Sequence, residues 1–272
     1  MDYANLHPIL FPIILTGLAS GLIAGLFGVG GGIILVPAIV FALDYIGQSQ
    51  SITMHMAVAT SLAIIIPTSI SSIIAHHKND AVDYNIIFNL SPGIFIFAIF
   101  GSFLTQIVSG DTLRLLFASI ALIASINMMK KFQFVLGNKI PLNRMFNFFV
   151  GSIIGFLSSM IGIGGGAISV PMMNSFSVPH HRSIGTASAL GLVISVPAAI
   201  TYACADTSSL DMPEWSIGMI SLPIIIIFIP LTIFASQIGA NIAHLLNEFF
   251  LRRIFSVFIL LMSIRMIYQV IV

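Results

Sequence analysis

The sequence predicts an all-α polytopic membrane protein built from two homologous halves. Charged residues make up 7% of the 272 residues and apolar residues 58%, with a mean hydropathy of +1.09, whereas a soluble domain carries about 25% charged residues. Long uncharged blocks recur along the chain, and one glycine-rich segment occurs twice. A chain this poor in charge cannot cover itself with a hydrated surface, so we expect a multi-pass protein of the cell inner (plasma) membrane.

Eight apolar blocks account for most of the chain, and most of them reach the roughly 17–25 residues that a spanning helix needs. They cover residues 9–43, 52–75, 86–108, 113–129, 146–173, 184–202, 216–242 and 251–272. The net charge of +1 gives no reason to expect nucleic acid as a partner. Cys204 is the only cysteine, which excludes an internal disulfide and a cysteine-based metal cluster. We expect no metal and no cofactor, and the lipid bilayer and a small anionic substrate as partners.

An internal repeat divides the chain. Gly28-Val-Gly-Gly-Gly…Pro37 returns as Gly162-Ile-Gly-Gly-Gly…Pro171 with the same spacing. "AVATSL" (57–62) then resembles "SIGTAS" (183–188), and "GSFLTQIVSGDTLRLLF" (101–117) resembles "GANIAHLLNEFFLRRIF" (239–255). Three matched segments in one order indicate a first transmembrane repeat at 1–129, a basic cytoplasmic linker at 130–145 and a second repeat at 146–272. Such duplication is common among secondary transporters.

Each repeat opens with a long block that is interrupted by glycines. As one helix, the 35 residues of block 9–43 would measure about 52 Å against a hydrocarbon core of about 30 Å. If each such block crosses once, both repeats point the same way, and six Lys and Arg residues face the cytoplasm against four outside. If each block turns back at its glycines, the repeats become inverted. Eight of the ten Lys and Arg residues are then cytoplasmic, all except Arg114 and Arg265. We prefer the inverted arrangement, because cytoplasmic loops carry an excess of positive charge.

The glycine runs predict a binding site for an anion. A new short helix is expected to start at Ile33 and another at Ala167, and the first N–H groups of a helix have no intrahelical partner. A helix N-terminus carries about half a positive charge, and glycines let a ligand approach the backbone. Two such termini near the midplane form an anion site without Lys or Arg. The expected contacts are Gly30, Gly31, Gly32, Gly164, Gly165 and Gly166. The competing interpretation is that glycines only permit close helix packing.

The apolar blocks contain neutral hydrogen-bond donors and no deeply placed acid, which argues against a cation site. The donors expected to bind substrate are Thr60, Ser61, Thr186, Ser188, Gln106 and Gln237, and Ser158, Ser159 and Asn241 are further neutral donors in the blocks. Alternatively, the serine and threonine hydroxyls bond their own helix backbones. His55 is a candidate for proton coupling, with a purely structural hydrogen bond as the alternative.

Together these segments resemble the TauE/SafE family of sulfite exporters. The paired glycine segments, the "ATSL" and "GTAS" segments and the "LRLLF" and "LRRIF" segments carry the resemblance, which extends from about Gly17 to Ile264. The family's glycine motif falls on Gly28–Gly32 and Gly162–Gly166, and its Gly-Thr-Ser segment on Ala59–Ser61 and Gly185–Ala187. This chain has Ala59 where glycine is usual and Ala187 where serine is usual.

The resemblance implies a membrane permease, usually an exporter, for sulfite or organosulfonates, and not an enzyme. We expect alternating access, in which one repeat rocks against the other around the glycine turns. With a negative cytoplasm, moving one negative charge outward gains about 2.3 kcal/mol per 100 mV, so export needs no coupling ion. The alternative is an anion channel of the same architecture.

Overall fold

The computed structural model describes residues 7–129, 137, 140–141, 143–208, 210, 212–243 and 248–271. Lys130, Lys131 and Lys139 of the expected linker lie outside the described residues. Within that part of the chain the protein forms ten helices and one short β-hairpin, so the all-α expectation is confirmed. The first repeat holds α1 (His7–Phe27), α2 (Gly32–Tyr45), α3 (Gln50–His77), α4 (Tyr84–Thr105) and α5 (Gly110–Met129). The second holds α6 (Arg144–Ile161), α7 (Gly166–Ser175), α8 (His180–Ala203), β1 (Ser216–Ile217), β2 (Ile220–Ser221), α9 (Leu222–Ile242) and α10 (Glu248–Ile271).

Helix lengths fit a membrane protein with two broken helices. Among the described residues α3, α4, α6, α8 and α9 are long and apolar enough to cross a bilayer. The helices that follow the glycine runs, α2 with 14 residues and α7 with 10, measure about 21 and 15 Å. They are too short to span a core of about 30 Å. The two long blocks are therefore broken at their glycines, as expected.

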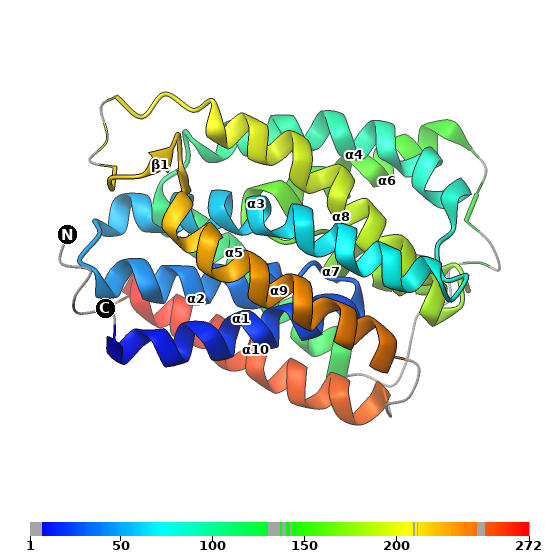
Figure 1. The fold of residues 1–272 in the computed structure, drawn as a ribbon. Helices are drawn as coiled ribbons and strands as arrows, with labels where there is room; N and C mark the ends of the chain where they lie inside the picture. The colour runs from blue at the N-terminus through cyan, green and yellow to red at the C-terminus, as the bar shows by residue number, and fades with distance from the viewer. Residues whose placement is uncertain are drawn as a thin grey trace.

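The helix contacts have a pseudo-two-fold pattern. Helix α1 packs on α9, and its counterpart α6 packs on α4, the counterpart of α9. In the same way α3 packs on α9 and α8 on α4, while the counterparts α3 and α8, and α5 and α10, pack on each other. Figure 1 shows α3 and α8 in the middle, with α4 and α6 on one side and α1 and α9 on the other.

Helices α3 and α8 are antiparallel. Thr186, near the start of α8, bonds to Asp83, which follows the end of α3. Thr60, in the first half of α3, bonds to Ser221, which follows the end of α8. These two central helices, which are counterparts by the matched sequence segments, therefore run in opposite directions where they pack.

Glycines also bring the outer helices close together. A Cβ on Gly17 or Gly21 would meet Leu231 or Thr232 of α9, and a Cβ on Gly151 or Gly155 would meet the α4 backbone at Leu90 or Ile94. The packing interpretation therefore holds for these four glycines.

Candidate functional site

The two glycine turns share their backbone geometry. Gly28 (φ 65°) and Gly162 (φ 73°) end α1 and α6, and Gly31 (φ 76°) and Gly165 (φ 77°) precede α2 and α7. All four lie in the left-handed region, which glycine adopts without the penalty that a Cβ brings. The new helices begin at Gly32 and Gly166, one residue before the expected Ile33 and Ala167.

The two turns are buried and cross each other in backbone contact. A Cβ on Gly32 would collide with the Gly162 carbonyl oxygen, and a Cβ on Gly166 with the Gly28 carbonyl oxygen. Between these contacts, a Cβ on Gly30 would lie 3.1 Å from the Gly164 Cα atom. The crossing is therefore reciprocal, and it places both predicted runs at the centre of the pseudo-two-fold arrangement.

Several backbone N–H groups at the crossing are unpaired. Gly31 and Gly165 use their carbonyls to accept from the first turns of α2 and α7, but the N–H groups just before and within those turns donate to nothing among the described residues. They belong to Gly30, Gly31, Gly32 and Ile33 in the first repeat and to Gly164, Gly166 and Ala167 in the second. Because a buried N–H without a partner is costly, such a cluster favours a polar ligand or water.

Unpaired side-chain hydroxyls surround the second glycine turn. The hydroxyls of Ser69, Ser158 and Ser169 have no hydrogen-bond partner in the part of the chain that the structure describes, and these residues are at most 1% exposed. The Ser158 Oγ lies 3.7 Å from where a Cβ of Gly165 would be, and Ser169 donates its backbone N–H to the Gly165 oxygen at 2.8 Å. Both hydroxyls therefore lie close to the start of α7.

Ser69 reaches the same turn from α3. Its Oγ lies 3.2 Å from the position of a Cβ on Gly191, and that position is 2.7 Å from the Gly164 oxygen. By the glycine register, the first repeat has Ala24 and Leu35 where the second has Ser158 and Ser169. The second turn is therefore richer in hydroxyl donors than the first.

The four predicted hydroxyl residues of α3 and α8 bond to protein. Thr60 accepts from the Ser221 N–H at 3.0 Å, and Thr186 accepts from the Asp83 N–H at 2.9 Å. Ser61 donates to the Gly162 oxygen at 2.7 Å. Ser188 lies 3.0 Å from the Ser72 hydroxyl and also donates to its own helix at Ile184. The structure thus brings Ser61 to the glycine turn and uses the other three to join helices.

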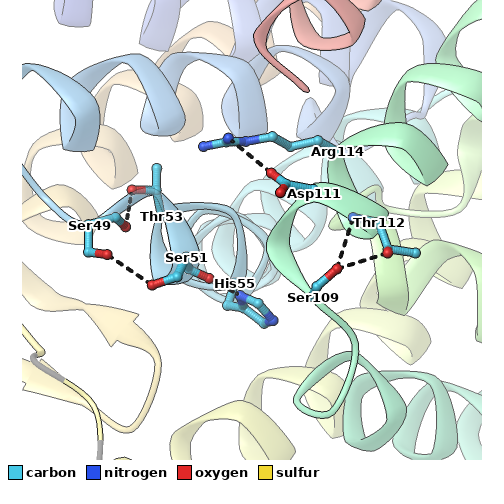
Figure 2. Close-up of polar contacts among 8 residues, drawn as sticks. All are labelled: Ser49, Ser51, Thr53, His55, Ser109, Asp111, Thr112 and Arg114. Carbon is cyan, nitrogen blue, oxygen red and sulfur yellow. Dashed lines mark hydrogen bonds and ion pairs between the residues drawn. The ribbon is translucent and has the colours of Figure 1, made fainter. Parts of the chain in front are cut away.

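The remaining predicted residues lie away from the crossing. Gln106 follows the end of α4, where its amide faces the Ser102 oxygen at 3.4 Å, and Gln237 is exposed on α9. His55 is in the second turn of α3, with Nδ1 3.1 Å from the Ser51 oxygen and Nε2 2.9 Å from the Val108 oxygen. Figure 2 shows His55 among the polar residues at this end of the bundle.

Comparison with known proteins identifies the chain. A family model described as "Sulfite exporter TauE/SafE" matches residues 13–266. The chain belongs to the TauE/SafE family. The matched segment contains both glycine turns and all the residues discussed at the crossing, and the protein is a membrane transporter, not an enzyme.

Curated relatives of this TauE/SafE chain bear the same general description. A probable membrane transporter protein of Haemophilus influenzae is 30% identical over 259 residues, which cover 93% of this chain and 96% of the relative. One from Methanocaldococcus jannaschii is 29% identical over 242 residues, 88% of each chain. The Bacillus subtilis protein YunE, also a probable membrane transporter protein, is 28% identical over 213 residues, 70% of this chain and 77% of the relative. No solved structure matches the chain significantly.

Two of the unpaired hydroxyls escape a sequence-based search of this TauE/SafE chain. Ser158 belongs to the neutral donors noted from the sequence, whereas Ser69 and Ser169 do not. A signal exists for Ser169, because it falls in the first turn after the second glycine run, where the first repeat has Leu35. No such signal marks Ser69, whose place beside Gly191 depends on how α3 packs on α8.

Proposed function

We propose that this TauE/SafE transporter exports a small sulfur oxyanion, such as sulfite or an organosulfonate, across the cell inner membrane. The anion is held by backbone N–H groups of the two glycine turns and by the hydroxyls of Ser69, Ser158 and Ser169. The observation that carries the proposal is the set of unpaired donors at the crossing. The family's description as sulfite exporters favours a sulfur oxyanion over other anions.

The donor set suits an anion that must also leave. Helix N-termini favour negative charge, and each hydroxyl donates one hydrogen bond without adding a formal charge. Since no Lys or Arg lies in the glycine runs or the helices α2 and α7, the anion is not held by a salt bridge there. Such a site binds an oxyanion with moderate strength, as a transport cycle requires.

Alternating access follows from the crossing of the two repeats. The antiparallel packing of α3 and α8 supports repeats that are inverted in the membrane, with each glycine turn entering from the opposite side. In the described conformation the turns touch each other, and we assign it to a closed state. Rocking one repeat against the other would separate the turns toward one side at a time.

The test is sulfite flux in proteoliposomes with an imposed membrane potential. We expect saturable flux that accelerates when the sulfite-containing side is made negative, and exchange that is stimulated by sulfite on the opposite side. Protein-free liposomes control for passive leakage. Flux that neither saturates nor responds to sulfite on the opposite side would identify an anion channel of the same architecture. No protein-dependent flux of sulfite or of an organosulfonate would refute the proposed substrate class.

A further inference from the structure

Arg114 is a buried charge whose hydrogen-bonding groups are mostly unused. It lies in the second turn of α5 and is 1% exposed. Its Nη1 atom is 3.5 Å from Oδ1 of Asp111, and the Asp111 side chain is 67% exposed. The Nε and Nη2 atoms are buried and have no hydrogen-bond partner among the described side chains and backbone. The guanidinium carries a formal positive charge and donates from five N–H groups, without any acceptor atom of its own.

Among the residues that the structure describes, the exposed carboxylate of Asp111 forms the one ion pair with this charge. An ion pair with a solvent-exposed carboxylate contributes little, because water screens it, while burial of a guanidinium is costly unless its donors are satisfied. Helix α3, which packs on α5, has no acidic residue along its whole length. Near its start, Thr53 and His55 already contact the backbone oxygens of Ser49 and Ser51. A polar ligand would supply hydrogen-bond acceptors for the Nε and Nη2 groups of Arg114.

The free edge of the guanidinium determines which ligand fits. Nε and Nη2 point their N–H groups in parallel, and this edge binds two oxygens of one carboxylate, phosphate or sulfur oxyanion. With Nη1 held by Asp111, the other edge remains for the ligand. Figure 2 shows the Arg114 side chain extending from α5 in the direction of α3, on the far side of Asp111 from Ser109 and Thr112.

The position of Arg114 relates this edge to the glycine crossing. A Cβ on Gly110, the first residue of α5, would lie 3.0 Å from the Ser51 oxygen, so α5 and α3 begin at the same end of the bundle. Ile65 of α3 contacts both Gly30 and Gly164 at the crossing. It lies ten residues beyond His55, which corresponds to about 15 Å of helix. Arg114 therefore lies near one end of the helix bundle, and the glycine crossing lies deeper inside it.

We propose that Arg114 forms a second oxyanion-binding site, at which the transported anion pauses between the glycine crossing and one face of the membrane. The proposal rests on the proposed function for the identity of the anion, and on Arg114 for the site. The ligand presents two oxygens to Nε and Nη2, as sulfite, a sulfonate or sulfate can. The same edge could take the phosphate of an anionic lipid, and the experiment separates these two sources.

The test is the thermal unfolding of the full-length protein in phosphatidylcholine nanodiscs, with sodium sulfite or sodium chloride at matched ionic strength. Arg114→Gln is compared with the wild type and with the control Arg265→Gln, which removes an exposed arginine stacked over Phe41. In chloride, Arg114→Gln is expected to unfold at the same temperature as the wild type or higher, because the change removes an uncompensated charge. Its half-maximal stabilisation by sulfite is expected to need about 10- to 100-fold more sulfite, since hydrogen bonds to charged groups are lost. Arg265→Gln should respond like the wild type.

Three outcomes would overturn the assignment. If sulfite stabilises Arg114→Gln and the wild type at equal concentrations, no oxyanion binds at Arg114. If Arg114→Gln unfolds at a lower temperature in chloride and its loss is unaffected by sulfite, the arginine is structural. If phosphatidylglycerol in the nanodisc produces the Arg114-dependent stabilisation and sulfite does not, the ligand is a lipid phosphate.

Sulfite flux is measured on the same preparations. Flux without Arg114-dependent stabilisation would refute the second site and leave the proposed function standing. Arg114-dependent stabilisation without flux would support oxyanion binding at Arg114 and refute the proposed function.

Discussion

The hydroxyl of Thr60 accepts a hydrogen bond from the backbone N–H of Ser221, at 3.0 Å. The same bond exists in the counterpart position, where Thr186 accepts from the Asp83 N–H at 2.9 Å. Ser221 and Asp83 are the residues before α9 and α4, which are repeat counterparts. Helix α3 therefore binds the start of α9, which follows α8 in the chain. In the same way, α8 binds the start of α4, which follows α3.

These paired bonds predict a stability effect. Thr60→Val and Thr186→Val keep the side-chain volume but leave a backbone N–H without its acceptor, so each should destabilise the protein by about 1–3 kcal/mol. Thr60→Ser and Thr186→Ser keep the hydroxyl and serve as controls. The measurement is thermal unfolding in nanodiscs together with the KM for sulfite. A change in KM with no change in unfolding temperature would instead make these hydroxyls substrate contacts.

Two glycines with positive φ, Gly47 and Gly28, allow the cost of backbone strain to be measured separately from the cost of a steric collision. Gly47→Ala places a Cβ at φ 77° with nothing within 4 Å, so it should cost about 1–2 kcal/mol from the left-handed backbone alone. Gly28→Ala has a similar φ of 65° but drives its Cβ into the Ile184 carbonyl. We expect Gly47→Ala to be recovered as folded transporter and Gly28→Ala to be lost from size-exclusion chromatography. Equal recovery of both would contradict the close crossing.

The unpaired hydroxyls predict that binding and stability respond in opposite ways. Ser158→Ala and Ser169→Ala remove buried groups without partners, so the unfolding temperature should stay the same or rise. If the hydroxyls bind the anion, each change should raise the KM for sulfite by about 10- to 100-fold, because a hydrogen bond to a charged ligand is lost. Ser102→Ala is the matched control, since Ser102 bonds its own helix at the Ala98 oxygen. An unchanged KM in both variants would show that Ser158 and Ser169 do not bind the anion.

His55 predicts a test of proton coupling. A carbonyl oxygen only accepts, so a neutral imidazole donates to either Ser51 or Val108 but not to both. We expect His55→Gln to lower stability by about 1 kcal/mol through the weakened contact between α3 and the α4–α5 connection. Potential-driven sulfite flux should persist in this variant, because potential alone supplies a driving force. Loss of flux, or a wild-type flux that responds to an imposed pH gradient while the variant's does not, would support coupling through His55.

Cys204 predicts a test of the inverted topology. It follows the last residue of α8 and is exposed, and inverted repeats place it outside the cell. A membrane-impermeant thiol reagent should label it on intact cells, and Cys204→Ser should abolish the label. Labelling that appears only after permeabilisation would favour parallel repeats.

The helices could be predicted from the sequence because their signals are local. Uncharged runs, glycine interruptions and the matched segments lie within short windows, and the helix starts after both glycine runs were predicted within one residue. The apolar block 216–242 is longer than the helix it contains, because its first six residues form a β-hairpin and α9 begins at Leu222. There Gly218 has φ 53° and packs on the Tyr202 carbonyl, a contact that an apolar window does not reveal.

The site could be predicted only in part. The glycine turns are visible in the sequence as two short glycine-rich segments. The hydrogen-bond partners of Thr60 and Thr186, however, are 161 and 103 residues away in sequence. The hydroxyls of Thr60, Thr186 and Ser188 have partners on other elements of the protein, and their role as substrate contacts stays a prediction. Ser69 and Ser169 have no partner among the described residues, because of helix packing that no local sequence pattern encodes. The isolation of Arg114 likewise depends on which helix faces α5.

The reciprocal fit of Gly32 on Gly162 and of Gly166 on Gly28 bears on biogenesis. When the first five helices have left the ribosome, their centre lacks the backbone that covers it, and α1 still lacks α9. The nascent first half must therefore wait in the bilayer with uncovered main-chain groups until the second half is inserted. A chain truncated between α5 and α6 would therefore keep this part of its backbone uncovered.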